Sequence, residues 1–347
     1  MVSIATFNNK GGVGKTTLTN NIASFLAQRD DARVLVVDCD PQCNTTQLLL
    51  GQEIAFNLYW ATGDRKYNCT TIGQILRPIQ DGDSAILNDI IPIDKSFTRF
   101  GVDLIPGDPK FSMIEDMLGA AWHGLKGGTI GGIRQTNWNN FLTASLKERY
   151  DYIFYDLGPS LGSINRSVLI GCDYFITPMG TDIFSILGIK NIAEWIKSWI
   201  ASYSVGIENC NRTDPGKVDH YKIPSELKIL KGYLGYTMQQ YITKSYKGQR
   251  RPTKSYDEII SQVPQEVNNS LGDFFKPGLT QEALQLGDVP HLYSLIPLAQ
   301  TKASPLHALK TSDGLVGSQF KQLADYKGIL SNIVENLVNN INDDNVA

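Results

Sequence analysis

The segment that most constrains this chain lies near its N-terminus, where a glycine-rich loop joins an apolar run to a helical pattern. The loop reads Asn-Asn-Lys-Gly-Gly-Val-Gly-Lys-Thr-Thr over residues 8–17. Glycines allow a tight turn whose N–H groups converge on a polyphosphate, and a helix beginning at Thr16 points its positive end at the same anion. The spacing predicts that Lys15 contacts the β- and γ-phosphates and that the Thr16 hydroxyl binds Mg²⁺. The loop departs from the strict pattern because Asn9 stands where glycine is usual, and a second lysine, Lys10, follows it.

Three aspartates stand at or just beyond the ends of two further apolar runs. Asp38 ends the run 33–38, Asp40 follows it, and Asp156 ends the run 151–156. Ligands of open α/β sheets bind beyond the carboxyl ends of strands, and Mg²⁺ prefers hard oxygen ligands. A lone aspartate after a strand is usually a turn or cap residue. Three of them, together with a phosphate loop, favour a nucleoside triphosphatase.

Composition indicates an ordinary globular protein, and its net charge does not favour binding to nucleic acid or membrane. The 347 residues carry 32 basic and 35 acidic side chains, a net charge of −3, so such a partner needs a local patch. The five cysteines are odd in number and form no Cys-x-x-Cys pair, which predicts a reduced, cytoplasmic chain. The N-terminus shows no signal-peptide pattern, and no apolar run reaches the length of a membrane span.

Apolar runs alternate with helical periodicity, which predicts an α/β fold: a three-layer sandwich around a mostly parallel sheet. The glycine-rich segment 124–132 is interpreted as a flexible connector. Residues 51–100 are interpreted mainly as loops around a short helix. The expected strands are residues 4–7, 33–38, 102–106, 151–156, 173–178, 227–236 and 291–296, and the expected helices are 16–28, 70–76, 137–148 and 187–200.

These motifs resemble the ParA/MinD group of P-loop ATPases, the deviant Walker A class. The match comprises residues 10–17, the Asp-Cys-Asp-Pro-Gln segment from Asp38, and Asp-Leu-Gly-Pro-Ser from Asp156. The Asp-Pro-Gln segment is similar to the ParA branch. The resemblance covers roughly residues 1–55 and 100–202, with weaker similarity at Ile296-Pro297 and in the final helix.

The resemblance implies a role for each motif residue. Lys10 would reach across a nucleotide-sandwich dimer to the partner's phosphates, Asp40 would position the attacking water, and Thr16, Asp38 and Asp156 would hold Mg²⁺. Lys10 and Lys15 would thus be catalytic with Asp40, and ATP would be preferred over GTP. The nucleotide-binding residues would be Lys10, Gly11, Gly12, Val13, Gly14, Lys15, Thr16 and Thr17.

The chain is longer than compact ParA relatives. We interpret residues 1–347 as one ParA-like domain with insertions at about 52–100, 203–226 and 240–290. The resemblance implies an ATPase that dimerises on ATP and binds DNA non-specifically in the nucleoid. It would hydrolyse ATP when a ParB-like or other partner protein stimulates it, in plasmid or chromosome partition or cargo positioning. Two alternatives remain: a regulatory or defence module whose insertions bind a protein, and a MinD-like membrane switch. Iron-protein chemistry is disfavoured because Cys172 stands alone.

Two features near the C-terminus bear on partners. Residues 241–256 contain five cations and no acidic residue, which is the pattern of a phosphate-backbone contact, although a solvated loop is nearly as common. The final helix has an apolar stripe from Ile329 to Ile341, but its polar face carries asparagine rather than lysine or arginine, so we expect packing against the sheet and no membrane binding. The candidate DNA-binding residues are Lys244, Lys247, Arg250, Arg251 and Lys254.

Overall fold

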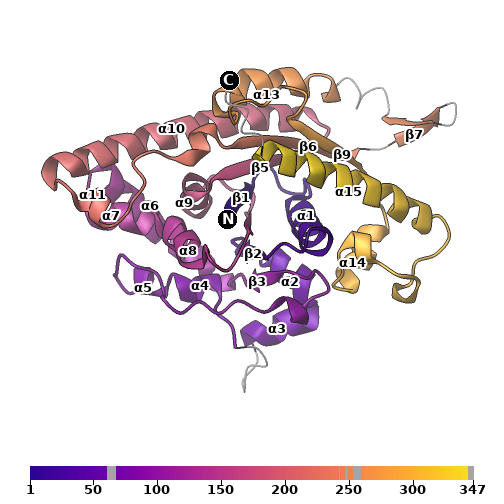
Figure 1. Cartoon of the computed structure of the whole chain (residues 1–347), viewed down its shortest axis with the longest axis horizontal. Helices are drawn as coiled ribbons and strands as arrows, with labels where there is room; N and C mark the ends of the chain where they lie inside the picture. Colours follow the sequence, from indigo (N-terminus) through magenta and orange to yellow (C-terminus); the bar gives the residue numbers. More distant parts are fainter. Residues whose placement is uncertain (61–67, 242, 247–248, 253–258, 343–347) are drawn as a thin grey trace.

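A seven-stranded sheet, with every strand parallel to its neighbours, forms the centre of the computed structural model (Figure 1). The structure describes residues 1–60, 68–241, 243–246, 249–252 and 259–342. The strand order is β3-β2-β4-β1-β5-β6-β9. The strands are β1 (Val2–Thr6), β2 (Val34–Asp38), β3 (Asp103–Ile105), β4 (Tyr152–Asp156), β5 (Tyr174–Met179), β6 (Tyr233–Tyr241) and β9 (Gln285–Pro290), and a separate antiparallel hairpin pairs β7 (Thr243–Tyr246) with β8 (Gln249–Pro252).

Helices cover both faces of this sheet, which confirms the predicted three-layer α/β fold. The α-helices are α1 (Lys15–Arg29), α2 (Asn44–Leu50), α3 (Gln52–Trp60), α4 (Ile72–Ile75), α5 (Arg77–Gln80), α6 (Ile114–Lys126), α7 (Ile130–Thr136), α8 (Trp138–Leu146), α9 (Ser163–Gly171), α10 (Ile183–Thr213), α11 (Lys217–His220), α13 (Val263–Leu271), α14 (Leu295–Thr301) and α15 (Gln319–Asn342). Short 3₁₀ helices span Lys95–Phe97, Pro109–Met113, Lys228–Lys231, Gly272–Phe274, Leu306–Ala308 and Thr311–Asp313.

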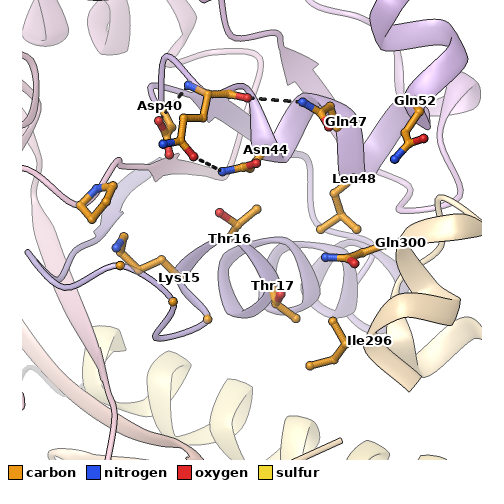
Figure 2. Close-up of a pocket in the computed structure, with 15 residues that line it drawn as sticks. Lys15, Thr16, Thr17, Asp40, Asn44, Gln47, Leu48, Gln52, Ile296 and Gln300 are labelled. Carbon is orange, nitrogen blue, oxygen red and sulfur yellow. Dashed lines mark hydrogen bonds between the residues drawn. The ribbon is translucent and has the colours of Figure 1, made fainter. Parts of the chain in front are cut away.

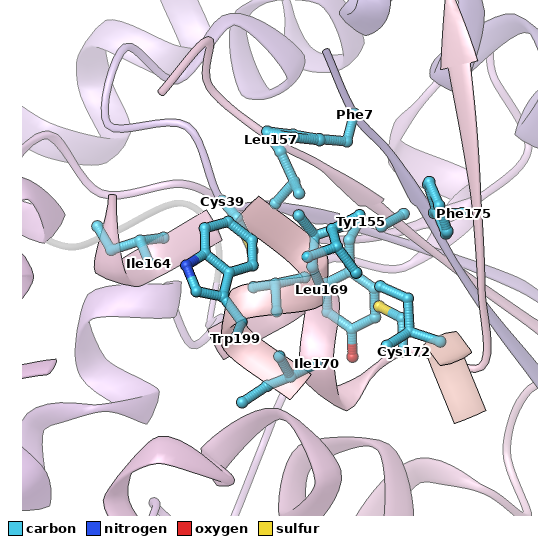
Figure 3. Packing of buried hydrophobic residues seen from close by; sticks show 14 of the residues in the cluster. Phe7, Cys39, Tyr155, Leu157, Ile164, Leu169, Ile170, Cys172, Phe175 and Trp199 are labelled. Carbon is cyan, nitrogen blue, oxygen red and sulfur yellow. The ribbon is translucent and has the colours of Figure 1, made fainter. Parts of the chain in front are cut away.

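Alternate residues of each central strand enter two separate cores. On β4, Phe154 packs on the side of α1 and α15, whereas Tyr155 packs on the side of α9 and α10. Figure 3 shows Tyr155 beside Cys172 and Leu169 in the second of these cores. Strands buried on both faces need apolar residues at every position, which is why the sequence showed continuous apolar runs rather than alternation.

The final helix α15 packs against β9 and α1, as its apolar stripe predicts. Leu330, Ile333 and Leu337 are buried in the core on that face of the sheet. In the part of the chain that the structure describes, none of the helices combines the length and apolar character needed to cross a bilayer.

Two strand predictions are wrong in position. The strand expected at 291–296 is β9, at Gln285–Pro290, and residue 295 instead begins α14. Gly287 and Pro290 hid this edge strand, because both residues are rare in strands. Gly287 is required by space: a Cβ there would lie 2.7 Å from Ile333 Cγ1 of α15. The strand expected at 227–236 begins only at Tyr233, after a 3₁₀ turn.

The interpretation of residues 124–132 as a flexible connector is also wrong. Helix α6 continues to Lys126 and α7 begins at Ile130, so only three residues separate two helices that pack closely. A Cβ on Gly132 would lie 2.6 Å from the Ala121 carbonyl oxygen. The glycines therefore serve close approach of two backbones, a use that composition cannot distinguish from a loop.

The segments interpreted as insertions contain regular structure. Residues 52–100 include α3, α4 and α5 rather than loops alone, and α10 extends to Thr213, well past the predicted end at residue 200. The segment from about 240 to 290 contains the β7–β8 hairpin and α13, and it ends with β9 of the central sheet.

Candidate functional site

A cleft of about 580 Å³ opens at the carboxyl ends of β1, β2 and β4, where the sequence placed its motifs. The loop before α1 lies on one side and Asp40 on another (Figure 2), and Pro159 also lines the cleft. Leu48, Ile296 and Gln300 line the far end, so the weak similarity noted at Ile296 belongs to this cleft.

The phosphate loop has the backbone conformation that its glycines permit. Gly12 and Gly14 have φ angles of 75° and 78°, in the left-handed region that other residues avoid. Gly14 precedes the first residue of α1, a helix of 15 residues whose first turn lines the cleft. The N–H groups of a helix's first turn have no partner within the helix. A helix N-terminus preceded by such a turn favours an anion, so the loop fits the phosphate that the sequence predicts there.

Lys15 is the buried cation of this loop. Its side chain is 7% exposed, and Nζ donates a hydrogen bond to the Lys10 carbonyl oxygen (2.9 Å). Burial lowers the pKa of Lys15, while the carboxylates of Asp156 and Asp40 act in the opposite direction. An ammonium that is buried and forms no ion pair with a carboxylate of the described residues is suited to accept a phosphate, because the anion would restore its favourable charged form.

Asp156 lies beneath the first turn of α1 and accepts two hydroxyl hydrogen bonds. Thr16 Oγ1 and Thr45 Oγ1 both donate to Asp156 Oδ2, at 2.8 and 2.7 Å. The other oxygen, Oδ1, is buried and has no hydrogen-bond partner among the described residues. Burial raises the pKa of Asp156 to about 6. An unpaired buried carboxylate oxygen beside a threonine hydroxyl fits the hard oxygen ligands that Mg²⁺ requires.

Asp38 lies deeper, under the start of α2. Its Oδ2 accepts hydrogen bonds from the backbone N–H and the hydroxyl of Thr46 (2.8 and 2.7 Å), and Oδ1 accepts one from Asp40 N (3.2 Å). Burial, and then the neighbouring Asp156, raises the pKa of Asp38 to about 8. Its contacts hold the segment that carries Asp40, so a role in the metal shell stays a prediction.

Asp40 is the carboxylate that reaches the cleft itself. It is 6% exposed, and its Oδ1 accepts a hydrogen bond from Gln42 N (2.9 Å). The loop after β4 packs directly on it, since a Cβ on Gly158 would lie 3.2 Å from Asp40 Oδ1. The structure thus brings Lys15, Thr16 and Asp40 to one cleft.

Lys10 is placed apart from these residues. Its side chain faces a neighbouring hollow of about 200 Å³, where Nζ forms an ion pair with Asp182. Although burial opposes the effect, the Lys10 ammonium lowers the pKa of Asp182, which also caps α10 by accepting hydrogen bonds from Phe184 N and Ser185 N. The two side chains are 36% and 38% exposed, so water screens the pair and a better partner can replace it.

Sequence reasoning missed Thr45, Thr46 and Asp182. Thr45 and Thr46 follow Asp38 by seven and eight residues, and only the turn between β2 and α2 brings their hydroxyls onto the two buried aspartates. Asp182 is 172 residues from Lys10. The available signal for Asp182 was its place three residues after the end of β5.

The basic segment lies on the hairpin that follows β6. In the β7–β8 pairing, Lys244 is opposite Arg251 and Ser245 is opposite Arg250. Lys247 and Lys254 lie outside the described residues. Figure 1 shows the hairpin at the periphery, beyond the end of β6 and away from α1.

The chain is similar in sequence and in fold to several known proteins. The family model AAA_31, described as an AAA domain, matches residues 1–208. A crystal structure of a Corynebacterium diphtheriae protein is 31% identical, with a TM-score of 0.75 over 99% of both chains. A ParA family protein of Chlamydia pneumoniae is 26% identical over 66% of this chain and 86% of its own length. The McdA–ATP complex of Cyanothece has the same fold, with a TM-score of 0.59, 15% identity, and coverage of 97% of this chain and 96% of its own.

The family match covers more than half of the chain and includes the phosphate loop, Asp40 and Asp156. We conclude that the chain belongs to the AAA_31 family and is a ParA-like P-loop ATPase.

Proposed function

We propose that the chain binds ATP with Mg²⁺, pairs with a second copy of itself in that state, and hydrolyses ATP slowly until a ParB-like or other partner protein stimulates it. The observation that carries this proposal is the position of Lys10, whose side chain lies outside the cleft formed by its own loop. A cation placed there suits the phosphates of a neighbouring copy better than its own. The McdA protein of similar fold was solved with ATP, which supports the choice of nucleotide.

Within the cleft, the chain's own groups divide the work of binding and hydrolysis. The N–H groups of Gly11–Thr17 and the Lys15 ammonium would hold the phosphates, and Asp40 would orient a water molecule toward the γ-phosphorus. Lys10 of the second copy would offset the charge that grows on the phosphate oxygens. Charge stabilisation of this kind is the main source of catalysis in phosphoryl transfer.

The residues around Asp156 fit Mg²⁺. The buried Oδ1 atom without a partner is the feature that a cation and its water shell would satisfy. Thr16 and Asp156 would hold the ion, with Asp38 behind them, and Mg²⁺ would neutralise the β- and γ-phosphate charge. Since both carboxylates have raised pKa values, ion binding would favour their ionised forms.

The mass of the purified chain, measured by light scattering with no nucleotide, Mg-ADP and Mg-ATP, tests the proposal. A chain of 38.4 kDa should double in mass only with Mg-ATP, most clearly in the Asp40→Ala variant, where hydrolysis cannot reverse the change. A single-copy mass at saturating Mg-ATP in that variant would contradict the proposed dimer.

DNA binding by the paired form is the second part of the proposal. The sequence of the β7–β8 hairpin and its flanks supplies Lys244, Lys247, Arg250, Arg251 and Lys254 without a carboxylate between residues 241 and 256. Figure 1 shows the hairpin beyond the end of β6, and none of its described residues lines the nucleotide cleft. We expect contact with the phosphate backbone, without sequence preference.

The salt dependence of binding checks this assignment. If all five cations contact phosphates, log affinity should fall with log salt concentration at a slope of about −4 to −5, at roughly 0.9 per contact. Replacing Arg250 and Arg251 by alanine should make the slope about 2 less negative and leave the basal ATPase rate unchanged. Lys95→Ala with Lys321→Ala, two exposed lysines elsewhere, is the matched control. Unchanged affinity after charge reversal at Arg250 and Arg251 would end the assignment.

The membrane alternative has less support. The apolar stripe of α15 is buried against β9 and α1, so Leu330, Ile333 and Leu337 are not available to a lipid surface. The regulatory alternative would keep the ATPase cycle and change only the partner.

A further inference from the structure

The N-terminus of α9 receives a carboxylate from another helix. Glu115, in the first turn of α6, accepts hydrogen bonds from Ser163 N and, at 3.1 Å, from Ile164 N. The residue before α9 is Gly162, which has no side chain to cap the helix. Glu115 therefore supplies the cap, and its negative charge is favoured by the helix dipole.

Glycine at position 162 leaves room for this contact. Its φ of −76° is open to any residue, so backbone conformation does not require glycine there. A Cβ at this position would instead collide with Glu115 Oε1. The space that a side chain would fill is occupied by the capping carboxylate.

A second contact ties the same two helices together. The Arg166 guanidinium of α9 stacks over the Trp122 ring of α6, 4.4 Å from its centroid. Arg166 Nη2 also donates to Ser163 Oγ at 3.1 Å, in the turn that Glu115 caps. The start of α9 is thus fixed relative to α6 by a charged cap and a stacked cation.

The start of α9 in turn fixes the loop that faces Asp40. Asn165 Nδ2 donates to the carbonyl oxygens of Gly158 and Ser160, both at 2.7 Å. Gly158 packs against the Asp40 carboxylate, and Pro159 lines the nucleotide cleft. Glu115 is therefore linked to the catalytic carboxylate through one helical turn and one asparagine side chain.

We propose that Glu115 is a positioning residue for hydrolysis: by capping α9 it holds Asn165, and through it the 157–162 loop, in the place that keeps Asp40 aligned with the attacking water. This inference rests on the proposed function. Glu115 is not one of the described residues that line the nucleotide cleft. Its replacement should therefore change turnover rather than nucleotide binding.

The test compares Glu115→Gln with Asp116→Asn, which removes the same charge from the next, exposed residue of α6. In Glu115→Gln, kcat should fall about 10- to 100-fold, because small displacements of an aligned group cost that much, while KM for ATP and the affinity for ADP change less than about threefold. Asp116→Asn should keep the parent rate. In Gly162→Ala, the added Cβ would displace the Glu115 carboxylate. This variant should therefore show the same loss of kcat without a change of charge.

A thermal unfolding curve of each variant shows whether a loss of activity comes from loss of the folded structure. A folded Glu115→Gln chain with the parent kcat would overturn the inference while leaving the proposed ATPase intact. A variant in which ADP affinity and kcat fall together would also overturn it, because that result describes a merely structural role. A parent chain that does not hydrolyse Mg-ATP at all would overturn the proposed function itself.

Discussion

The Lys10→Ala variant is expected to lose about 10³- to 10⁵-fold in ATPase rate, the range found for cations supplied in trans to a transferring phosphoryl group. Its affinity for ATP as a single copy should stay close to that of the parent, because Lys10 pairs with Asp182 rather than lining its own cleft. Lys15→Ala is the contrasting control. That change should weaken nucleotide binding as well as hydrolysis, since Lys15 lies in the cleft.

Mixing two inactive variants tests whether Lys10 acts across a dimer. In a mixed pair, the Lys10→Ala copy keeps Asp40 and receives Lys10 from an Asp40→Ala partner, so one of the two sites is complete. With equal amounts and random pairing, about a quarter of all sites should regain activity, because a two-fold symmetric interface exchanges the same residue in both directions. No recovery on mixing, when both variants form dimers, would show that Lys10 acts within its own chain.

The Asp40→Ala variant should lose about 10²- to 10⁴-fold in hydrolysis, the usual contribution of a group that orients or deprotonates water. It should still bind ATP and remain in the paired, DNA-binding form, since Asp40 is expected to act on water rather than on phosphate. Turnover of radiolabelled ATP and light scattering measure the two properties on one sample.

Asp40→Asn separates lost charge from lost loop geometry. Asparagine can still accept the hydrogen bond that Gln42 N gives to Asp40 Oδ1, so the turn after β2 should keep its shape. If Asp40→Asn hydrolyses ATP at the parent rate, the carboxylate charge is not needed and the assigned role is wrong. Equal loss in both variants would support it.

The parts of the site that sequence could predict are those coded locally. Lys15, Thr16 and the positive φ angles of Gly12 and Gly14 all follow from one short stretch. Asp38 and Asp156 were predictable because continuous apolar runs mark strands buried on both faces. These features need no knowledge of which strands are neighbours.

What sequence could not predict depends on distant residues or on space. Glu115 lies 48 residues from Ser163, and neither position carries a pattern of its own. Sequence does not show that α6 packs closely on α7, so the glycine-rich stretch 124–132 was interpreted as a connector. Strand β9 was misplaced because its Gly287 is required by the nearby side chain of Ile333 in α15. In these segments, tertiary contacts rather than the local propensities of the residues determine the structure that forms.

The strand order has one more consequence. From β1 the chain first builds outward through β2 and β3 to one margin of the sheet, then returns past β1 to build the opposite margin through β5, β6 and β9. The reversal happens beside β1, and that is where the phosphate loop opens, as in other doubly wound sheets. The helices α4 and α5 and the β7–β8 hairpin lie toward those margins, and none of their described residues lines the cleft, so surfaces built there can change without changing the residues that line the cleft.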